Sequence, residues 1–289
     1  MSDAQGRYIE FCKSSFTDLD LNGLSILLDC ANGATYSVAP KVFSELGANV
    51  ETIGASPDGI NINQNCGSTS PNVLKEAIIK GSYDIGIAFD GDGDRILIVT
   101  SDGDILDGDD ILYILSKEIP ANSGVVGTLM TNKALELYFQ NEGIEFSRAD
   151  VGDKYVLQRL IERSWVLGGE PSGHIICLDS APTGDAIVAA LKFLNATKDK
   201  GFSVEKSLEG FKKFPQTLIN LKVNNPNKII ISDKFWEKVT EIELQLGEDG
   251  RVLIRPSGTE PLIRIMVESK DSGISENLCN SLADLAQRI

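Results

Sequence analysis

Residues 90–95 read Asp-Gly-Asp-Gly-Asp-Arg and directly follow the apolar run at residues 85–89. Two carboxylates about 4 Å apart repel each other by about 4 kcal/mol at an effective dielectric of about 20, so converging carboxylates require a cation between them. The intervening glycines let the backbone curl tightly enough for the acidic side chains to converge. Hard oxygen ligands favour Mg²⁺ or Ca²⁺ over zinc. The pattern predicts a divalent metal site at the end of a strand. Its candidate ligands are Asp90, Asp92 and Asp94.

Two alternatives for this acidic loop use the same residue types. Asp-Gly pairs also form ordinary hairpin turns, and residues 101–104 are interpreted in that way. A calcium-binding EF-hand loop begins Asp-x-Asp-x-Asp but requires glycine at its sixth position and glutamate at its twelfth. Those positions hold Arg95 and Ser101, so the sequence excludes an EF-hand.

A second polar loop reads Gly-Gly-Glu-Pro-Ser-Gly-His at residues 168–174. Glu170 offers an acceptor, Ser172 a hydroxyl, and His174 is the only histidine of the chain. Recognition of a sugar requires this mixture, because sugar hydroxyls both donate and accept hydrogen bonds. A glycine-rich turn with a structural histidine explains the same residues, and the loop by itself leaves both interpretations open.

A third loop reads Arg-Pro-Ser-Gly-Thr-Glu-Pro at residues 255–261. A guanidinium, hydroxyls and backbone N–H groups made accessible by glycine are the parts of a phosphate site. The alternative is a solvated β-turn, which is less favoured because prolines stiffen the loop. The candidate phosphate contacts are Arg255, Ser257, Gly258, Thr259 and, on the next strand, Arg264.

The composition limits the class of protein. The chain has 289 residues, which accommodates two or three domains of about 100–150 residues each. Its formal net charge of −15 argues against nucleic acid and anionic membranes as partners. No run approaches the ~18 apolar residues of a membrane span, and no signal-peptide pattern is present. Five scattered cysteines without a CxxC pair favour free thiols in a reducing compartment, so we expect a cytoplasmic protein.

Strands and helices alternate along most of the chain, which predicts α/β layers with a largely parallel sheet. Strands are expected at residues 24–29, 49–53, 84–89, 125–129, 165–167, 175–178, 216–223, 252–254 and 262–268. Helices are expected at residues 38–46, 71–80, 109–118, 132–142, 153–162, 184–196, 234–246 and 275–288. In such sheets, ligands bind at the carboxyl ends of strands, where the loops at residues 30–33 and 90–95 are expected.

The expected fold class is α/β, with two mixed α/β layered domains followed by a small α+β C-terminal domain. The first domain, residues 1–106, carries the acidic loop, and the second, residues 107–214, carries the Glu170–His174 loop. The third, residues 215–289, carries the candidate phosphate loop. The similar rhythm of the first two domains suggests a duplication.

Together the three loops resemble the α-D-phosphohexomutase superfamily, and among its members most closely the phosphoglucosamine mutases. The metal loop of that family is matched by residues 90–95, its sugar loop by residues 170–174 and its phosphate loop by residues 255–259. The resemblance begins near Gly6, continues to the C-terminus, and includes Val151–Val156 and Pro261–Arg264.

The resemblance implies an enzyme that interconverts hexose 6-phosphate and hexose 1-phosphate through a bisphosphate. Glucosamine phosphates are the expected substrates, on the route to UDP-N-acetylglucosamine. A phosphoserine donates the phosphoryl group, with Mg²⁺ as cofactor. Arg95 corresponds to a residue near the transferring phosphoryl group, and Arg95 and Lys154 are the candidates for the general base. Glu170, Ser172 and His174 correspond to sugar contacts, and the phosphate loop with Arg264 corresponds to the clamp on the other phosphate.

The sequence departs from the family at three places. Pro171 and Ala186 replace the more usual glutamine and glycine, and no Ser-His pair is present to carry the phosphoserine. We therefore expect a fragment that begins at the second of four family domains and lacks the nucleophile and the fourth metal position. Its expected partner is the N-terminal domain of the same polypeptide, and a homodimer is left open.

Other functions remain open at this point. A phosphomannomutase or phosphoglucomutase has similar loops, and the isolated fragment could be a non-catalytic module that binds Mg²⁺ and sugar phosphate. A phosphatase of the haloacid dehalogenase type fits poorly. Such enzymes follow Asp-x-Asp with a small β-branched residue, whereas Gly93-Asp94 stands here.

Overall fold

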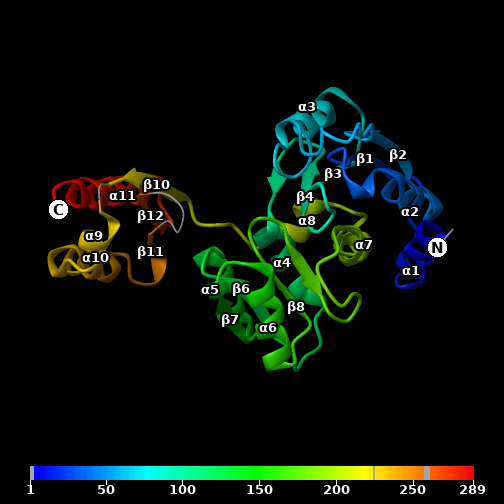
Figure 1. Cartoon of the computed structure of the whole chain (residues 1–289). Coiled ribbons are helices and arrows are strands. Elements are labelled where there is room, and N and C mark those ends of the chain that lie inside the picture. The colour runs from blue at the N-terminus through cyan, green and yellow to red at the C-terminus, as the bar shows by residue number, and fades with distance from the viewer. Residues whose placement is uncertain (1–2, 224, 257–260) are drawn as a thin grey trace. The chain divides into compact units, whose positions relative to one another are not determined.

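The computed structural model describes residues 3–223, 225–256 and 261–289 (Figure 1). The chain forms two compact units. The first comprises residues up to Thr131 together with Tyr138–Phe211, and the second comprises Asn132–Leu137 together with Lys212–Ile289. Within the described ranges, no helix combines the length and the apolar character needed to cross a membrane.

The first sheet of the first unit has the strand order β2-β1-β3-β4-β5. Its strands are β1 (Ser25–Asp29), β2 (Asn49–Ile53), β3 (Ile85–Phe89), β4 (Ile96–Thr100) and β5 (Ile105–Leu106). Strands β2, β1 and β3 are parallel, whereas β4 is antiparallel to both β3 and β5. Every residue of β3 and β4 is buried, as expected for apolar strands covered on both faces. The helical segments are α1 (Ala4–Ser14), η1 (Ala34–Ser37), α2 (Ala39–Glu45) and α3 (Asn72–Lys80).

The second sheet of this unit has the order β7-β6-β8-β9. Its strands are β6 (Val125–Thr128), β7 (Phe146–Ala149), β8 (Leu167–Gly169) and β9 (Ile175–Cys177). Strands β7, β6 and β8 are parallel and β9 is antiparallel to β8. The helical segments are α4 (Gly108–Leu115), η2 (Ser116–Glu118), α6 (Asp153–Arg163), α7 (Ala186–Thr197), η3 (Lys198–Lys200) and α8 (Val204–Leu208). Helix α5 (Lys133–Glu142) connects β6 to β7, and its residues up to Leu137 are grouped with the second unit.

The two sheets share one connectivity. The order β2-β1-β3-β4 of the first sheet recurs as β7-β6-β8-β9 in the second, with the same parallel and antiparallel pairs. In each case a helix connects the first strand to the second and another connects the second to the third. The common topology is consistent with the duplication that the sequence suggests.

The second unit contains a small antiparallel sheet with the order β10-β12-β11. Its strands are β10 (Gln216–Lys222), β11 (Gly250–Pro256) and β12 (Leu262–Ser269), and its helical segments are α9 (Pro226–Ile230), α10 (Asp233–Leu246), η4 (Gly247–Asp249) and α11 (Ser272–Gln287). One face of α10 is apolar, with its buried residues at helical spacing. That face consists of Phe235, Val239, Ile242 and Leu246, and it packs into one core with Ile263, Ile265 and Val267 of β12.

The expected fold class is confirmed: two mixed α/β layered domains precede a small α+β domain. One strand lies elsewhere than expected, at Leu167–Gly169 instead of residues 165–167. Glycine suits this strand because a Cβ atom at Gly168 would lie 2.9 Å from the carbonyl oxygen of Val126 on β6. Strands β4, β5 and β7 and helices α1, α8 and α9 were not expected from the sequence.

Candidate functional site

The acidic loop connects β3 to β4, and its carboxylates converge. Asp90, Asp92 and Asp94 each offer an oxygen, and these oxygens all lie within 4.8 Å of one another. Asp90 is buried, Asp94 is half-buried and Asp92 is exposed. The cluster therefore opens to solvent on the side of Asp92.

Asp90 organises the backbone of the loop. Its Oδ1 accepts hydrogen bonds from the N–H groups of Gly93 at 3.2 Å and of Asp94 and Arg95 at 3.1 Å. Gly93 has a φ of +79°, a conformation that favours glycine. Burial raises the pKa of the Asp90 carboxyl above its ordinary value, and the neighbouring Asp94 adds to the rise. A cation at the cluster would favour the ionised form of Asp90.

Arg95 provides positive charge beside the cluster. Its Nε lies 3.6 Å from Asp90 Oδ2 and 3.8 Å from Asp94 Oδ1. The side chain is 45% exposed, so solvent screens much of this attraction. Arg95 therefore lies at the rim of the site, where its guanidinium can approach a bound anion.

The loop that follows β1 packs against the acidic loop, as expected from their strand ends. The N–H of Ala34 donates to the carbonyl oxygen of Gly91 at 2.8 Å. A Cβ atom at Gly33 would lie 2.2 Å from the same oxygen, so the backbones can approach this closely only with glycine at position 33. The Asn32-Gly33 turn thus supports the acidic loop from the neighbouring strand.

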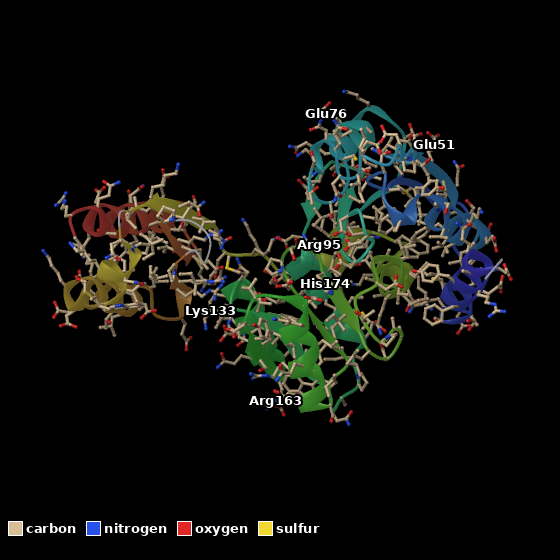
Figure 2. The ribbon with its side chains drawn as sticks, viewed as in Figure 1. Glu51, Glu76, Arg95, Lys133, Arg163 and His174 are labelled. Atoms are coloured by element: carbon tan, nitrogen blue, oxygen red, sulfur yellow. The ribbon has the colours of Figure 1, made fainter. Side chains whose placement is uncertain are left out.

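The second polar loop joins the acidic loop directly. The N–H of Ile96 donates to the carbonyl oxygen of Gly173 at 3.0 Å, and Arg95 and His174 form an isolated antiparallel bridge. His174 Nδ1 lies 3.1 Å from Asp94 Oδ2. Figure 2 labels Arg95 and His174, which lie near each other in this view. Two loops that are distant in the sequence are therefore in direct contact.

Glu170 contacts the residue before α6, and Lys154 lies in the first turn of that helix. Glu170 Oε1 accepts a hydrogen bond from the N–H of Gly152 at 2.9 Å. Lys154 is exposed in the first turn of α6, and its Nζ lies 4.6 Å from the centroid of the Tyr155 ring. Ser172 is exposed and offers its hydroxyl to solvent. The sequence provides no signal for the role of Gly152, which only the fold reveals.

The proposed phosphate contacts belong to the second unit. Ser257, Gly258 and Thr259 lie outside the described residues. Arg255 on β11 and Arg264 on β12 are register partners, directly opposite each other. Like charges at such positions repel, and no described carboxylate lies within ion-pair distance of either guanidinium. This pair of arginines is a favourable place for an anion.

The chain matches a known family along most of its length. Residues 6–103 match "Phosphoglucomutase/phosphomannomutase, alpha/beta/alpha domain II". Residues 107–214 match "alpha/beta/alpha domain III" of the same family, and residues 218–285 match its "C-terminal domain", domain IV.

Individual relatives match the whole length of this chain. The phosphoglucosamine mutase of Legionella pneumophila strain Corby is 48% identical over 298 residues, an alignment that covers 100% of this chain and 66% of that protein. The phosphoglucosamine mutase of Aeromonas salmonicida strain A449 is 50% identical over 294 residues, covering 100% of this chain and 65% of that protein. The chain thus spans about two thirds of the length of these relatives.

A solved structure shows the same fold. The crystal structure of Aspergillus fumigatus N-acetylphosphoglucosamine mutase in complex with GlcNAc-6P and magnesium superposes with a TM-score of 0.80 at 19% identity. The superposition covers 98% of this chain and 66% of that one. The chain therefore belongs to the phosphoglucomutase/phosphomannomutase family of α-D-phosphohexomutases and carries the family's domains II, III and IV.

Proposed function

We propose that the whole protein is an isomerase that interconverts glucosamine 6-phosphate and glucosamine 1-phosphate through a bisphosphate, on the route to UDP-N-acetylglucosamine. The observation that carries the proposal is the junction of the acidic loop with the Glu170–His174 loop. The contacts between Ile96 and Gly173 and between Asp94 and His174 bring converging carboxylates beside side chains suited to a sugar.

The carboxylates fit a magnesium ion. Asp90, Asp92 and Asp94 supply only hard oxygen ligands, and the loop backbone is fixed through Asp90 Oδ1. Bound Mg²⁺ would neutralise charge on a phosphoryl group during its transfer. Arg95 at the rim would add a guanidinium on the exposed side. Phosphoryl transfer needs mainly positioning and charge neutralisation, and these residues can supply both.

Each unit contains side chains that we assign to the substrate. We assign Glu170 and Ser172 to the sugar hydroxyls, because one offers an acceptor and the other an exposed hydroxyl. We assign the non-transferring phosphate to Arg255 and Arg264, together with the loop that contains Ser257, Gly258 and Thr259. Arg95 and Lys154 are retained as candidates for the general base. We also propose domain boundaries at residues 1–106, 107–214 and 215–289.

We propose an amino sugar as the substrate, in place of glucose or mannose, because relatives at 48% and 50% identity are phosphoglucosamine mutases. A phosphoglucomutase or phosphomannomutase is the alternative, since the family name covers both activities. The activity is proposed for the whole protein, because the phosphoserine of the family mechanism has no candidate Ser-His within these 289 residues.

The test is a coupled assay of the whole protein with Mg²⁺ and a bisphosphate primer. Glucosamine 6-phosphate should give a higher kcat/KM than glucose 6-phosphate or mannose 6-phosphate. Asp92→Asn should lower kcat strongly, whereas Asp102→Asn, in the neighbouring hairpin turn, removes the same charge and should leave it unchanged. A higher kcat/KM for a neutral sugar phosphate would instead identify a phosphoglucomutase or phosphomannomutase. Full activity of Asp92→Asn would refute the metal site.

A further inference from the structure

His174 is buried beside the acidic cluster. Its side chain is 5% exposed, and its Nδ1 lies 3.1 Å from Asp94 Oδ2. A carboxylate oxygen can only accept, so an Nδ1–H group at this distance is placed to donate to Asp94. The loop geometry holds the ring in place, because Gly173 and Ile96 are hydrogen-bonded through their backbones.

The other ring nitrogen faces protein. His174 Nε2 is buried and has no hydrogen-bond partner among the described residues. A Cβ atom at Gly184 would lie 2.2 Å from Nε2, so this nitrogen is closely covered by the turn before α7. One nitrogen is therefore occupied by Asp94 and the other is covered, which leaves neither of them presented to a sugar in solution.

The two oxygens of Asp94 differ in their surroundings. Oδ2 lies 3.1 Å from His174 Nδ1, whereas Oδ1 is buried without a hydrogen-bond partner in the described part of the chain. Arg95 Nε, 3.8 Å away, is too distant for a hydrogen bond to Oδ1. Asp94 thus keeps one oxygen unused beside Asp90 and Asp92, whose carboxylates lie within 4.8 Å.

We propose that His174 is a positioning residue for Asp94, which it orients through Nδ1 so that Oδ1 stays available to a divalent cation. This role rests on the metal site proposed above and differs from the sugar contact that the family resemblance implies. A hydrogen bond to one oxygen of a ligating carboxylate restricts its rotation. Such partners commonly change metal affinity about 10- to 100-fold.

The experiment measures Mn²⁺ binding to the whole protein by electron paramagnetic resonance, with Mg²⁺ as competitor. His174→Leu removes the donor and should weaken Mn²⁺ binding by about 10- to 100-fold. His174→Asn places an amide N–H near the position of Nδ1 and should recover most of the affinity. His174→Gln is the matched control. It places its amide near the position of Nε2 and should not recover the Mn²⁺ affinity. In an Asp94→Asn background, His174→Leu should have no further effect.

Each result has a defined meaning. If Asp92→Asn leaves Mn²⁺ binding unchanged, the metal site itself fails and this inference fails with it. If Asp92→Asn weakens binding but His174→Leu does not, only the positioning role is refuted. If His174→Leu does not fold, the Mn²⁺ affinities of His174→Asn and His174→Gln are compared instead. Equal affinities of these two variants overturn the inference. Loss of metal-free glucosamine 6-phosphate binding with unchanged Mn²⁺ affinity in His174→Gln would instead establish a sugar contact.

Discussion

At the scale of single residues, Arg255 and Arg264 are marked as a candidate anion site because their two positive charges face each other across the sheet. Register partners in an antiparallel pair have Cβ atoms about 4.5–5.5 Å apart, and like charges at this distance destabilise the sheet. Neither arginine has a described carboxylate as ion-pair partner. By contrast, Arg251 on the same strand pairs with the buried Glu268 at 2.7 Å, as a structural arginine does.

Arg255→Ala should therefore weaken substrate binding without a cost in stability. A hydrogen bond to a charged group contributes about 1.5–3 kcal/mol, so the affinity for glucosamine 6-phosphate should fall about 10- to 150-fold in calorimetric titration. Arg255→Lys should recover part of it, because lysine keeps the charge but lacks the guanidinium fork.

The control is Arg288→Ala, which removes the same charge at the exposed C-terminal end of α11. The affinity of this variant for glucosamine 6-phosphate should equal that of the unmodified protein. Unchanged binding in Arg255→Ala, or an equal loss in both variants, would contradict the phosphate assignment.

At the scale of elements, the N-terminus of α7 connects distant parts of the first unit. Asp185 caps the helix, and its Oδ1 accepts from the N–H groups of Ile187 and Val188 at 3.0 Å. The hydroxyl of Tyr8 on α1 donates to both Asp185 oxygens at 2.8 Å. Burial and the adjacent carboxylate raise the pKa of Tyr8, so its hydroxyl stays protonated and continues to donate. The next residue, Ala186, donates its N–H to Gly93 of the acidic loop at 3.0 Å.

Asp185→Ala should destabilise this junction. Loss of an N-cap costs about 1 kcal/mol, and loss of the bond from Tyr8 to a charged acceptor adds about 1.5–3 kcal/mol. Hydrogen exchange should accelerate at Ile187 and Val188 and along α1, and the urea midpoint should fall. Asp185→Asn keeps a capping oxygen and should protect the two helix amides. Equal exchange at these amides in Asp185→Ala and the unmodified protein would show that the cap is dispensable.

At the scale of the whole molecule, the proposed machinery is distributed over the chain. The loops proposed to bind metal and sugar lie in the first unit, and the arginine pair lies in the second. Both units have buried cores of their own, including the cluster around Phe235 and Ile263 in the second. Residues 1–289 can therefore fold even if they do not catalyse the reaction by themselves.

We predict that residues 1–289 alone do not form glucosamine 1-phosphate at a measurable rate. The family mechanism passes the phosphoryl group through a serine, which splits one difficult exchange into two covalent transfers. Ser172 is assigned to binding, and no Ser-His pair is present in the sequence. The assay supplies the purified chain with glucosamine 6-phosphate, Mg²⁺ and a bisphosphate primer, and compares it with the whole protein. Rapid turnover by residues 1–289 would show that another nucleophile exists within them.

Much of the fold could be predicted from the sequence because its signals are local. Apolar runs mark β1 and β3, and helical spacing marks α3 and α10. Short elements were harder. Strand β7 reads Phe-Ser-Arg-Ala and forms because it pairs with β6, and β8 begins two residues later than expected because close packing selects its glycines. Such elements depend on neighbours that are distant in the sequence.

The sequence by itself determined the composition of the candidate site: acidic side chains separated by glycine, a polar loop with the single histidine, and arginines near a stiff turn. Residue type and local spacing decide which ligands can be offered. Which of these groups come into contact depends on how the elements pack. The contact of His174 with Asp94, the bond from Gly152 to Glu170 and the register of Arg255 with Arg264 join residues from separate elements. Strand pairing and close packing create these contacts, and the periodicity of a single segment contains no information about them.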